Sequence, residues 1–386
     1  MRLVDLRGTP ASTPPTIEVR ASEAAELTRL IGAIAGEDHH SGYDVGKDRL
    51  AGLRTALPDG LLDRIRAVGA GDDKAFFGLS NLTVRLDPPG DIDQLLDLLD
   101  REPEASWRLL LSLAVFDADW DDAPADGRAI AAGDLDALEA IRGCCDTPDR
   151  YAPEAVRTLV ATDPAAHGRE VASILREVRD AIWGKLREEA MGAIERDVTY
   201  RRARIDAGDD PAAVVLEATN GFALDDDPTI ERVLLVPSFW LRPWIIVDQF
   251  VDLRTLVLST PVGDSFLALP AEQPPPSLLK LSKALSDEGR LQLLRRMSCG
   301  PVSLSEATEH LGVTKPTAHH HLSILRQAGL VVMGGGGRST RYSLRVDPAE
   351  AAHDALAAYV PVRGVTPPTP PTPPTPPSPP AVPASG

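Results

Sequence analysis

The strongest constraint on the fold lies in residues 302–332, where two short helical patterns flank a turn that contains Gly312. Glycine is common at such a point because the chain often needs a positive φ or a close backbone approach there. In the second pattern, three apolar residues fall at i, i+4 and i+7 and would share one face of a helix. These residues are Ala318, Leu322 and Leu325. The spacing predicts a helix-turn-helix whose second helix packs on the helices before it.

The opposite side of this second helix carries hydrogen-bonding side chains near its N-terminal end, namely Lys315, Thr317, His319 and His320. In a helix-turn-helix, that end of the second helix enters the major groove of DNA and contacts base edges. The free amides of a helix N-terminus are also available to phosphate. These residues therefore indicate that double-stranded DNA is the partner of this segment.

A β-hairpin is expected directly after the helix-turn-helix. Apolar-rich runs at 330–333 and 341–344 surround the glycine-rich stretch 334–340. The hairpin would hold Arg338 and Arg341, and such a wing lies along the phosphate backbone or reaches into the minor groove. We expect most of the DNA affinity to come from phosphate contacts. The residues expected to make them are Lys315, Arg338, Arg341 and Arg345.

The distribution of charge supports this interpretation. The chain has a formal net charge of -17, which taken alone argues against a nucleic-acid partner. Within residues 277–346, however, ten Lys and Arg stand against four Asp and Glu, so this segment carries +6 and the remainder of the chain -23. A basic island on an acidic body suits a module that meets phosphate while the body stays off the DNA.

Residues 285–294 (LSDEGRLQLL) and 304–330 resemble, almost position for position, the opening helix and the helix-turn-helix of ArsR-type winged-helix repressors. The resemblance covers under a fifth of the chain. It implies a winged-helix homodimer that represses from a near-palindromic operator, with helices at about 279–286 and 348–360 forming the dimer seam. At the matching positions, it implies DNA-facing side chains at Thr314, Lys315, Thr317, His319 and His320. His321 takes a position that serves partly in packing.

Metal sensing is not expected. Metal sensors of this family often carry a Cys-x-Cys pair in the helix before the turn, and the equivalent residues 306–311 contain no cysteine. The last helix offers Asp347, Glu350 and His353 without a second histidine, a weak ligand set for a transition metal. The run His319-His320-His321 cannot converge on one ion, because adjacent side chains on a helix point about 100° apart. We expect neither a bound metal nor a cofactor.

The chain is expected to be multidomain and mostly α-helical, with an α+β body and a C-terminal winged helix-turn-helix. The predicted parts are a disordered N-terminus at 1–16, a sensor or interaction domain at 17–270, a proline linker at 271–276, a DNA-binding and dimerisation module at 277–360, and a disordered proline-rich tail at 361–386.

Helical patterns dominate the predicted body. The proline-free stretch from His167 to about Ile205 predicts one long amphipathic helix, or two with a kink near Gly184 or Gly192. Residues 17–20 are a candidate for the first strand. Three further apolar or β-branched runs predict a small antiparallel sheet, at 233–237, 244–247 and 255–259.

One stretch of the body is a candidate ligand pocket, formed by Trp240, Arg242 and Trp244. Aromatic-lined pockets with one placed charge suit small ligands, so a small-molecule effector is a candidate partner. The alternative is a pair of core tryptophans beside an exposed arginine.

The sequence contains no glycine-rich phosphate loop, no Gly-x-Ser-x-Gly and no His-Glu-x-x-His, so we expect no catalytic residues and no enzyme. Three cysteines, no apolar stretch long enough to span a bilayer and no signal-peptide pattern favour a cytoplasmic protein without membrane contact. We interpret the chain as a DNA-binding transcriptional regulator, by its resemblance a repressor, whose body senses a signal. Two alternatives stay open: a winged helix that serves as a protein-interaction platform, and an enzyme body fused to a DNA-binding module.

Overall fold

The computed structural model describes residues 14–36, 43–70, 75–88, 90–115, 129, 153–224, 227–250, 252–268, 272–334, 340–345 and 348–360. The termini expected to be disordered, 1–16 and 361–386, lie outside this part of the chain except for residues 14–16. Thr16 already belongs to the first strand. We call residues 14–268 the body and residues 272–360 the C-terminal module.

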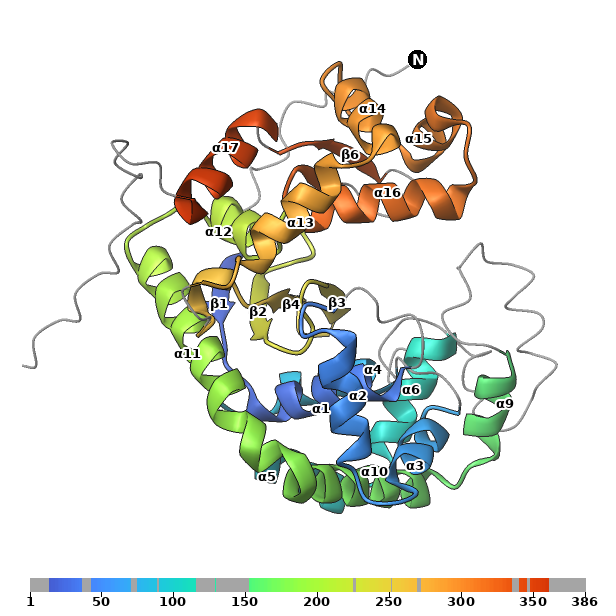
Figure 1. The fold of residues 1–386 in the computed structure, drawn as a ribbon. Helices are drawn as coiled ribbons and strands as arrows, with labels where there is room; N and C mark the ends of the chain where they lie inside the picture. The colour runs from blue at the N-terminus through green and yellow to red at the C-terminus, as the bar shows by residue number, and fades with distance from the viewer. Residues whose placement is uncertain are drawn as a thin grey trace, which may run out of the picture.

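The body is mainly helical (Figure 1). Its described α-helices are α1 (Glu23–Ala35), α2 (Lys47–Thr55), α3 (Leu61–Val68), α4 (Ala75–Leu79), α5 (Ile92–Arg101), α6 (Ala105–Val115), α9 (Pro153–Ala161), α10 (Pro164–Val178), α11 (Gly184–Asp206) and α12 (Pro211–Ala218). Short 3-10 turns lie at η1 (Ser80–Arg85) and η3 (Asp264–Phe266). Its strands are β1 (Thr16–Val19), β2 (Arg232–Ser238), β3 (Ile246–Phe250) and β4 (Thr255–Pro261).

The sheet of the body has the strand order β1-β2-β4-β3. Strands β1 and β2 are parallel, β2 and β4 are parallel, and only β3 and β4 are antiparallel. The antiparallel sheet predicted from the runs at 233–237, 244–247 and 255–259 is therefore wrong for the pairing of β2 with β4 and confirmed for the pairing of β3 with β4. The reason is that β3 folds back along the outer side of β4, which leaves β4 beside β2 and pointing the same way. Strand β1 reaches β2 through the helical part of the body, a long crossover of the kind that parallel pairing requires.

The long helix expected from 167 to 205 is present. Helices α10 and α11 are joined by a π-helical turn at η2 (Arg179–Trp183), so the chain stays helical from Pro164 to Asp206. The π turn ends where Gly184 begins α11. The predicted irregularity near Gly184 is thus confirmed, and its physical form is a π-bulge, a common cause of helix kinks.

The body packs around α1. Almost every residue of this helix is buried, because α1 lies between the sheet and the other helices and is covered on all sides. The main core joins its apolar side chains to those of α3, α5, α10 and α11 and to one face of the sheet. A smaller cluster on the other face of the sheet contains Ala25, Leu234 and Val257.

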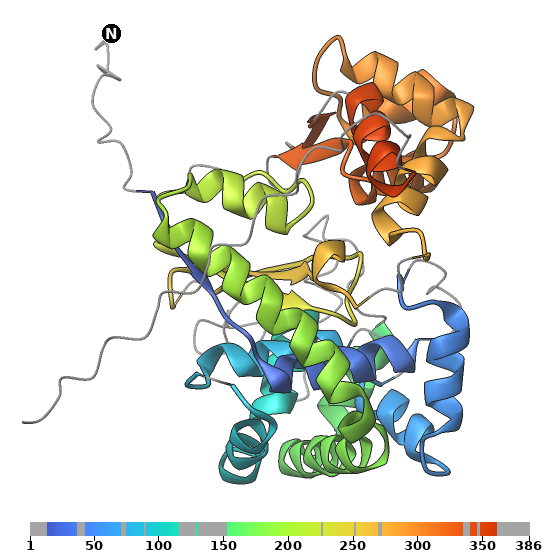
Figure 2. The same ribbon diagram turned by 60° about the vertical axis from the view of Figure 1, so that its left-hand side comes forward.

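The C-terminal module has a hydrophobic core of its own. Its elements are α13 (Pro276–Leu285), α14 (Glu288–Met297), α15 (Leu304–Leu311), α16 (Lys315–Gln327), β5 (Val331–Gly334), β6 (Arg341–Leu344) and α17 (Pro348–Tyr359). Figure 2 shows the module as a separate lobe above the body, with α13 leading down to it. In the described part of the chain, no helix has both the length and the apolar character needed to cross a bilayer.

Candidate nucleic-acid interface

The turn between α15 and α16 is fixed by local signals. Helix α15 begins with a capping box, in which Ser303 and Glu306 each bond to the other's backbone N–H. It ends at Gly312, whose φ of 64° lies in the left-handed region that favours glycine. Thr314 then caps α16 by accepting a hydrogen bond from the Thr317 N–H. The predicted helix, glycine turn and second helix are all present.

Helix α16 packs through the face expected from its spacing. Ala318, Leu322 and Leu325 each have 0% exposed surface and join the core of the module. Helices α14 and α15 contact α16 on this side. The position of α16 therefore depends on apolar packing against the two helices that precede it.

The N-terminal end of α16 presents its polar side chains to the outside. The five residues predicted to face DNA are all exposed: Thr314, Lys315, Thr317, His319 and His320. Within this set, the Thr314 and Thr317 hydroxyls lie 2.9 Å apart. A helix end with free amides, a lysine and two histidines is equipped to donate hydrogen bonds to base edges and phosphates. That these side chains contact DNA remains a prediction.

His321 differs from its two histidine neighbours. Its side chain is only 15% exposed, and its Nδ1 lies 3.5 Å from Asp287 Oδ1. Asp287 caps α14 by accepting a hydrogen bond from the Arg290 N–H, and this bond holds the pKa of the Asp287 carboxyl below its usual value. His321 thus joins α16 to the start of α14, in line with its expected part in packing.

Strands β5 and β6 follow α16 as an antiparallel pair. Val302, which precedes α15, pairs with Tyr342 and so attaches this small sheet to the helix-turn-helix. Arg341 is exposed and forms an ion pair with Glu306 at 3.2 Å. Arg338 lies outside the described residues. Of the two arginines expected in the hairpin, Arg341 is therefore the one that the structure places.

Arg345, expected to contact phosphate, has a different partner in the structure. Its Nη1 donates a hydrogen bond to Asn220 Oδ1 of the body at 2.9 Å. The residue is half-buried, and this burial lowers the pKa of its guanidinium, an effect that the charge of Glu217 opposes. In this conformation Arg345 contacts the body, and its contact with phosphate remains a prediction.

The two helices expected to form a dimer seam lie against each other. Helix α13 contacts α17, and large apolar side chains on α13, on α17 and at the residue after α17 are exposed in the part of the chain that the structure describes. The exposed fractions are 55% for Leu279, 54% for Leu356 and 50% for Val360. These residues provide an apolar surface on the module.

The three residues of the candidate ligand pocket do not share one environment. Trp240 has no exposed surface and packs under the guanidinium of Arg49, whose central carbon lies 5.0 Å from the ring centre. Arg242 is 3% exposed and forms ion pairs with Asp44 and Asp264. Trp244 is half-buried. The alternative of an exposed arginine is wrong, because Arg242 is buried, and the ligand pocket itself stays a prediction.

Sequence reasoning missed the residues that join the body to the module. Asn220 is bonded both to Arg345 and to the last turn of α16, and Lys280 of α13 forms an ion pair with Asp44 at 2.6 Å. The dipeptide Asn220-Gly221 was an available signal, since it favours positive φ and marks special turns. Among the residues that the structure describes, no three His, Cys, Asp or Glu side chains gather in a way that would hold a metal ion.

Comparison with known proteins finds similarity in the segment that contains the helix-turn-helix. Residues 287–332 match the family model described as "Bacterial regulatory protein, arsR family". The regulator CmtR of Mycobacterium tuberculosis (strain ATCC 25618 / H37Rv) is 38% identical over 68 residues, which are 18% of this chain and 58% of that protein. NmtR of the same strain is 37% identical over 62 residues, 16% of this chain and 52% of that protein.

A further relative is the transcriptional repressor SdpR of Bacillus subtilis (strain 168), 36% identical over 62 residues, 16% of this chain and 69% of that protein. The chain thus spans a little over half the length of the CmtR and NmtR relatives. No solved structure matches this chain significantly.

Proposed function

Because this chain belongs to the ArsR family of bacterial regulatory proteins, we propose that it is a sequence-specific transcriptional repressor whose body receives a signal. The observation that carries the proposal is the outward-facing N-terminal end of α16, where Lys315, His319 and His320 are exposed on a helix whose other face is fully packed. That end is suited to the major groove.

In this proposal, affinity and selectivity come from different residues. Lys315 donates to guanine O6 and N7, while Thr317, His319 and His320 contact neighbouring base edges. The β5–β6 hairpin acts as the wing, and Arg341 and Arg338 contact phosphate from it. Phosphate contacts give binding its strength and its salt dependence, whereas base contacts decide which sequence is chosen.

We further propose that the functional form is a homodimer. The apolar surface of Leu279, Leu356 and Val360 would be covered by the same surface of a second copy, as two-fold symmetry requires. Sedimentation of the Leu279→Glu, Leu356→Glu variant should then give a monomer. Leu291→Glu is the matched control, since Leu291 is 47% exposed on a different helix. A dimer that survives the double substitution contradicts this assignment.

The test of function is selection of bound fragments from sheared genomic DNA at two salt concentrations. We expect enrichment of a short inverted repeat that is lost at high salt. Lys315→Ala, His319→Ala, His320→Ala should lose the preferred sequence while keeping non-specific binding. Arg341→Ala should weaken binding to all sequences and reduce the slope of log affinity against log salt by about 0.9.

Lys185 provides the matched control, because it is an exposed lysine on α11 of the body. Lys185→Ala should change neither affinity nor sequence preference. If the native protein enriches no sequence at either salt, the DNA-binding role is wrong, and the protein-interaction role of the module becomes the better hypothesis. The effector of the body is to be sought among small molecules that shift the enriched DNA affinity.

A further inference from the structure

The segment Thr219–Ala223, which follows α12, makes direct contacts with the C-terminal module, and we call it the latch segment. Asn220 Nδ2 donates to the carbonyl of Gln327 at 2.8 Å and to that of Arg326 at 3.4 Å. Both carbonyls lie in the last turn of α16, where the helix itself supplies no further donors, and the Arg326 carbonyl also accepts from the Gly329 N–H at 2.8 Å. Asn220 Oδ1 accepts from Arg345 at 2.9 Å. One body side chain therefore joins the end of α16 to the residue that follows β6.

The backbone of the latch segment extends the small sheet of the module. Met333 N–H donates to the Gly221 carbonyl at 2.9 Å, and Ala223 N–H donates to the Met333 carbonyl at 3.3 Å. Phe222 and Met333 form a parallel bridge on the free side of β5. Pairing of an extended segment with an open sheet edge is a recurrent mode of docking. The body thus occupies the outer edge of the β5–β6 hairpin.

Gly221 permits this close approach. Its φ is 109°, and a Cβ built on it would lie 2.7 Å from the Val331 carbonyl oxygen. Real Cβ atoms essentially never approach so closely, and the neighbour is backbone that cannot rotate away. Any other residue at 221 would therefore push β5 off the latch segment.

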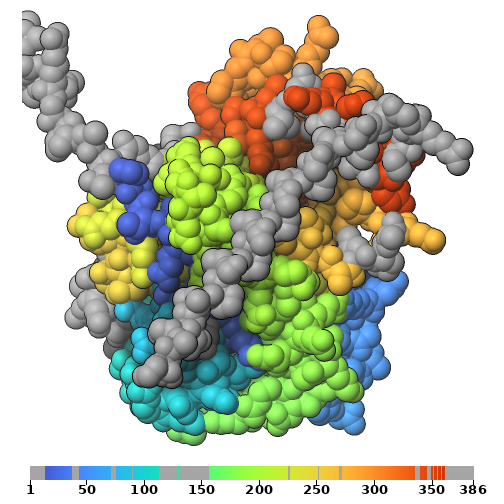
Figure 3. Space-filling view, turned by 90° about the vertical axis from the view of Figure 1, so that its left-hand side faces the viewer, coloured from blue at the N-terminus to red at the C-terminus, as the bar shows by residue number. Residues whose placement is uncertain are grey.

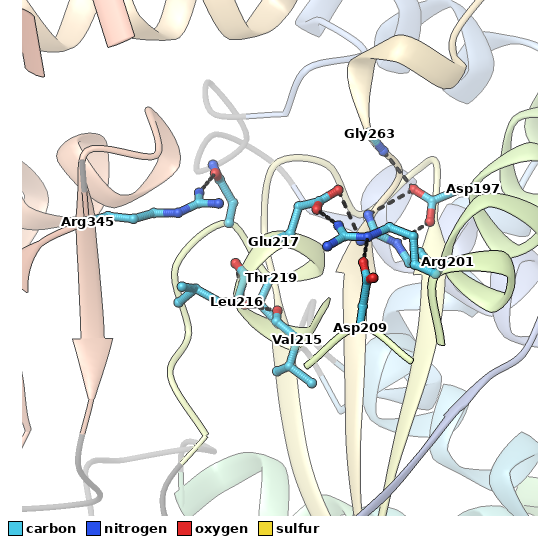
Figure 4. A network of polar contacts seen from close by, with 11 residues as sticks. Asp197, Arg201, Asp209, Val215, Leu216, Glu217, Thr219, Gly263 and Arg345 are labelled. Carbon is cyan, nitrogen blue, oxygen red and sulfur yellow. Dashed lines mark hydrogen bonds and ion pairs between the residues drawn. The ribbon is translucent and has the colours of Figure 1, made fainter. Parts of the chain in front are cut away.

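The latch segment is held firmly on the body side (Figure 4). The Thr219 hydroxyl is buried, donates to the Val215 carbonyl at 2.7 Å and accepts from the Phe222 N–H at 2.9 Å. Behind it, Glu217 is paired with Arg204 of α11. Figure 3 shows the yellow-green part of the body, which includes α12, directly against the orange and red module. The contact is therefore a joint between two ordered parts.

A second joint fixes the start of the module. Lys280 of α13 pairs with Asp44, and Asp264 accepts from the Ser277 N–H in the first turn of α13. Arg242 lies between these two carboxylates and pairs with both. In this structure the body therefore contacts the module at both α13 and β5, and these contacts together set the orientation described here.

This orientation is unfavourable for DNA. Figure 1 shows α16 along the side of the module that is turned toward the body. All residues outside 277–346 together carry a charge of -23, so phosphates that approach α16 meet a repulsive field. The docked state also engages Arg345, a cation at the base of the hairpin. Both effects weaken the electrostatic part of DNA binding.

We propose that the latch segment is an autoinhibitory contact: the latched protein binds DNA weakly, and release of Asn220 and Gly221 from the module raises the affinity. This inference rests on the proposed DNA-binding function. The body then controls the module by opening or closing this joint.

The first test uses two variants of the full chain. Asn220→Gly removes the three side-chain hydrogen bonds, while glycine keeps the native φ of 53° accessible. Gly221→Ala places a Cβ against Val331. Both should bind the selected DNA about 10-fold more tightly, with a salt slope steeper by about 0.9 from the freed Arg345. Gly208→Ala is the control, because Gly208 has a φ of 85° but nothing within 4 Å of its Cβ position.

A second test uses a disulfide to hold the latch segment against β5, so it does not depend on a variant that weakens this contact. Phe222→Cys with Met333→Cys, in a chain whose three native cysteines are replaced by serine, should cross-link the paired positions on oxidation. The oxidised protein should bind DNA about 10-fold more weakly than the reduced protein. Equal or tighter binding after oxidation, or no gain in the two latch variants, overturns the autoinhibitory role.

Failure of the proposed function gives a different pattern. If native, latch-variant and reduced proteins all fail to bind any DNA, the DNA-binding role is wrong and autoinhibition falls with it. Amide exchange shows separately whether the latch segment contacts β5 in solution. The Met333 amide should exchange faster in Asn220→Gly than in the native chain if the latch exists in solution, whether or not DNA binds.

Discussion

The body and the C-terminal module bury different kinds of side chain. Among the described residues, twenty polar or charged side chains are buried; nineteen of them lie in the body, and Arg290 alone lies in the module. The body is larger than the module, but the difference in size is much smaller than this nineteen-to-one ratio of buried polar side chains. The module keeps an apolar core and presents polar groups outward, as a surface that recognises another molecule requires. The body instead builds its interior partly from paired charges and hydrogen bonds.

The buried cluster under the sheet illustrates the body's interior. Glu26 has no exposed surface and accepts hydrogen bonds from the Ser238 hydroxyl at 2.6 Å and from the Phe239 and Trp240 amides at 2.9 and 3.0 Å. Arg29, one turn later, bonds to Ser259. Burial raises the pKa of the Glu26 carboxyl and lowers the pKa of Arg29 to about 10. Such groups stabilise a fold only when every partner is present.

The largest effect is therefore expected from Glu26→Ala. It leaves two buried amides without their acceptor and removes one of the two negative charges, Glu26 and Asp248, that favour the charged form of Arg29. This loss should cost about 3–5 kcal/mol of the body's unfolding free energy. Urea unfolding followed by tryptophan fluorescence measures this loss. Glu188→Ala, at an exposed position of α11, should change it by less than about 0.5 kcal/mol. If the two variants have the same stability, the buried cluster does not stabilise the body.

The module should respond most strongly to loss of apolar volume. Leu322 of α16 has no exposed surface, so Leu322→Ala should destabilise the module by about 2–5 kcal/mol. Leu291, 47% exposed on α14, is the control, and its replacement by Ala should cost less than about 1 kcal/mol. Amide exchange of β5 and β6 resolves the module from the body. Equal costs for the two leucines would contradict an apolar core at α16.

This contrast explains which features were predictable from sequence. The helix-turn-helix is specified locally, by Gly312 at the turn and by the spacing of Ala318, Leu322 and Leu325. The exposure of Lys315, His319 and His320 follows from the same spacing, since side chains opposite a packed face must point outward.

The body was predictable only in part, because its key contacts join distant residues. Each predicted strand overlaps an observed one, although the run at 244–247 shares only its last two residues with β3. Alternation of apolar residues does not encode which strands are neighbours, so the parallel pairing of β2 with β4 was missed. Asn220 meets Gln327 across 107 positions of sequence. A single polar residue such as Asn220 belongs to no apolar repeat, so no pattern in the sequence predicts this contact. The Asn-Gly dipeptide signals only a turn.

The next prediction is that the stability of the body depends on pH through a buried histidine. His167 is buried; its Nδ1 lies 2.9 Å from the Ser106 hydroxyl and its Nε2 3.1 Å from the Val68 carbonyl. Burial lowers the pKa of His167 below the ordinary value of 6.5. The unfolded chain then takes up the proton first as the pH falls, so stability is present above about pH 6.5 and is lost below it.

For one proton the slope reaches at most about 1.4 kcal/mol per pH unit. Urea unfolding of the body between pH 7 and pH 5, compared for the native chain and His167→Gln, isolates this contribution, because glutamine stays neutral. The difference between the two should shrink or reverse toward pH 5. A difference that does not vary with pH would show that His167 is protonated equally in the folded and unfolded chain.

The smallest predicted effect is the loss of stability on removing a helix cap, and it should be the same in the body and in the module. Each contains a capping box: Ser303 with Glu306 at the start of α15, and Asp91 with Gln94 at the start of α5. Both boxes are local and lie at a helix end, so Ser303→Ala and Asp91→Ala should each cost about 1 kcal/mol. Amide exchange of α15 and of α5 measures the two losses separately. A much larger loss for Asp91→Ala would mean that even the body's local signals depend on its buried polar contacts, and the contrast between the regions would then extend to how their helices begin.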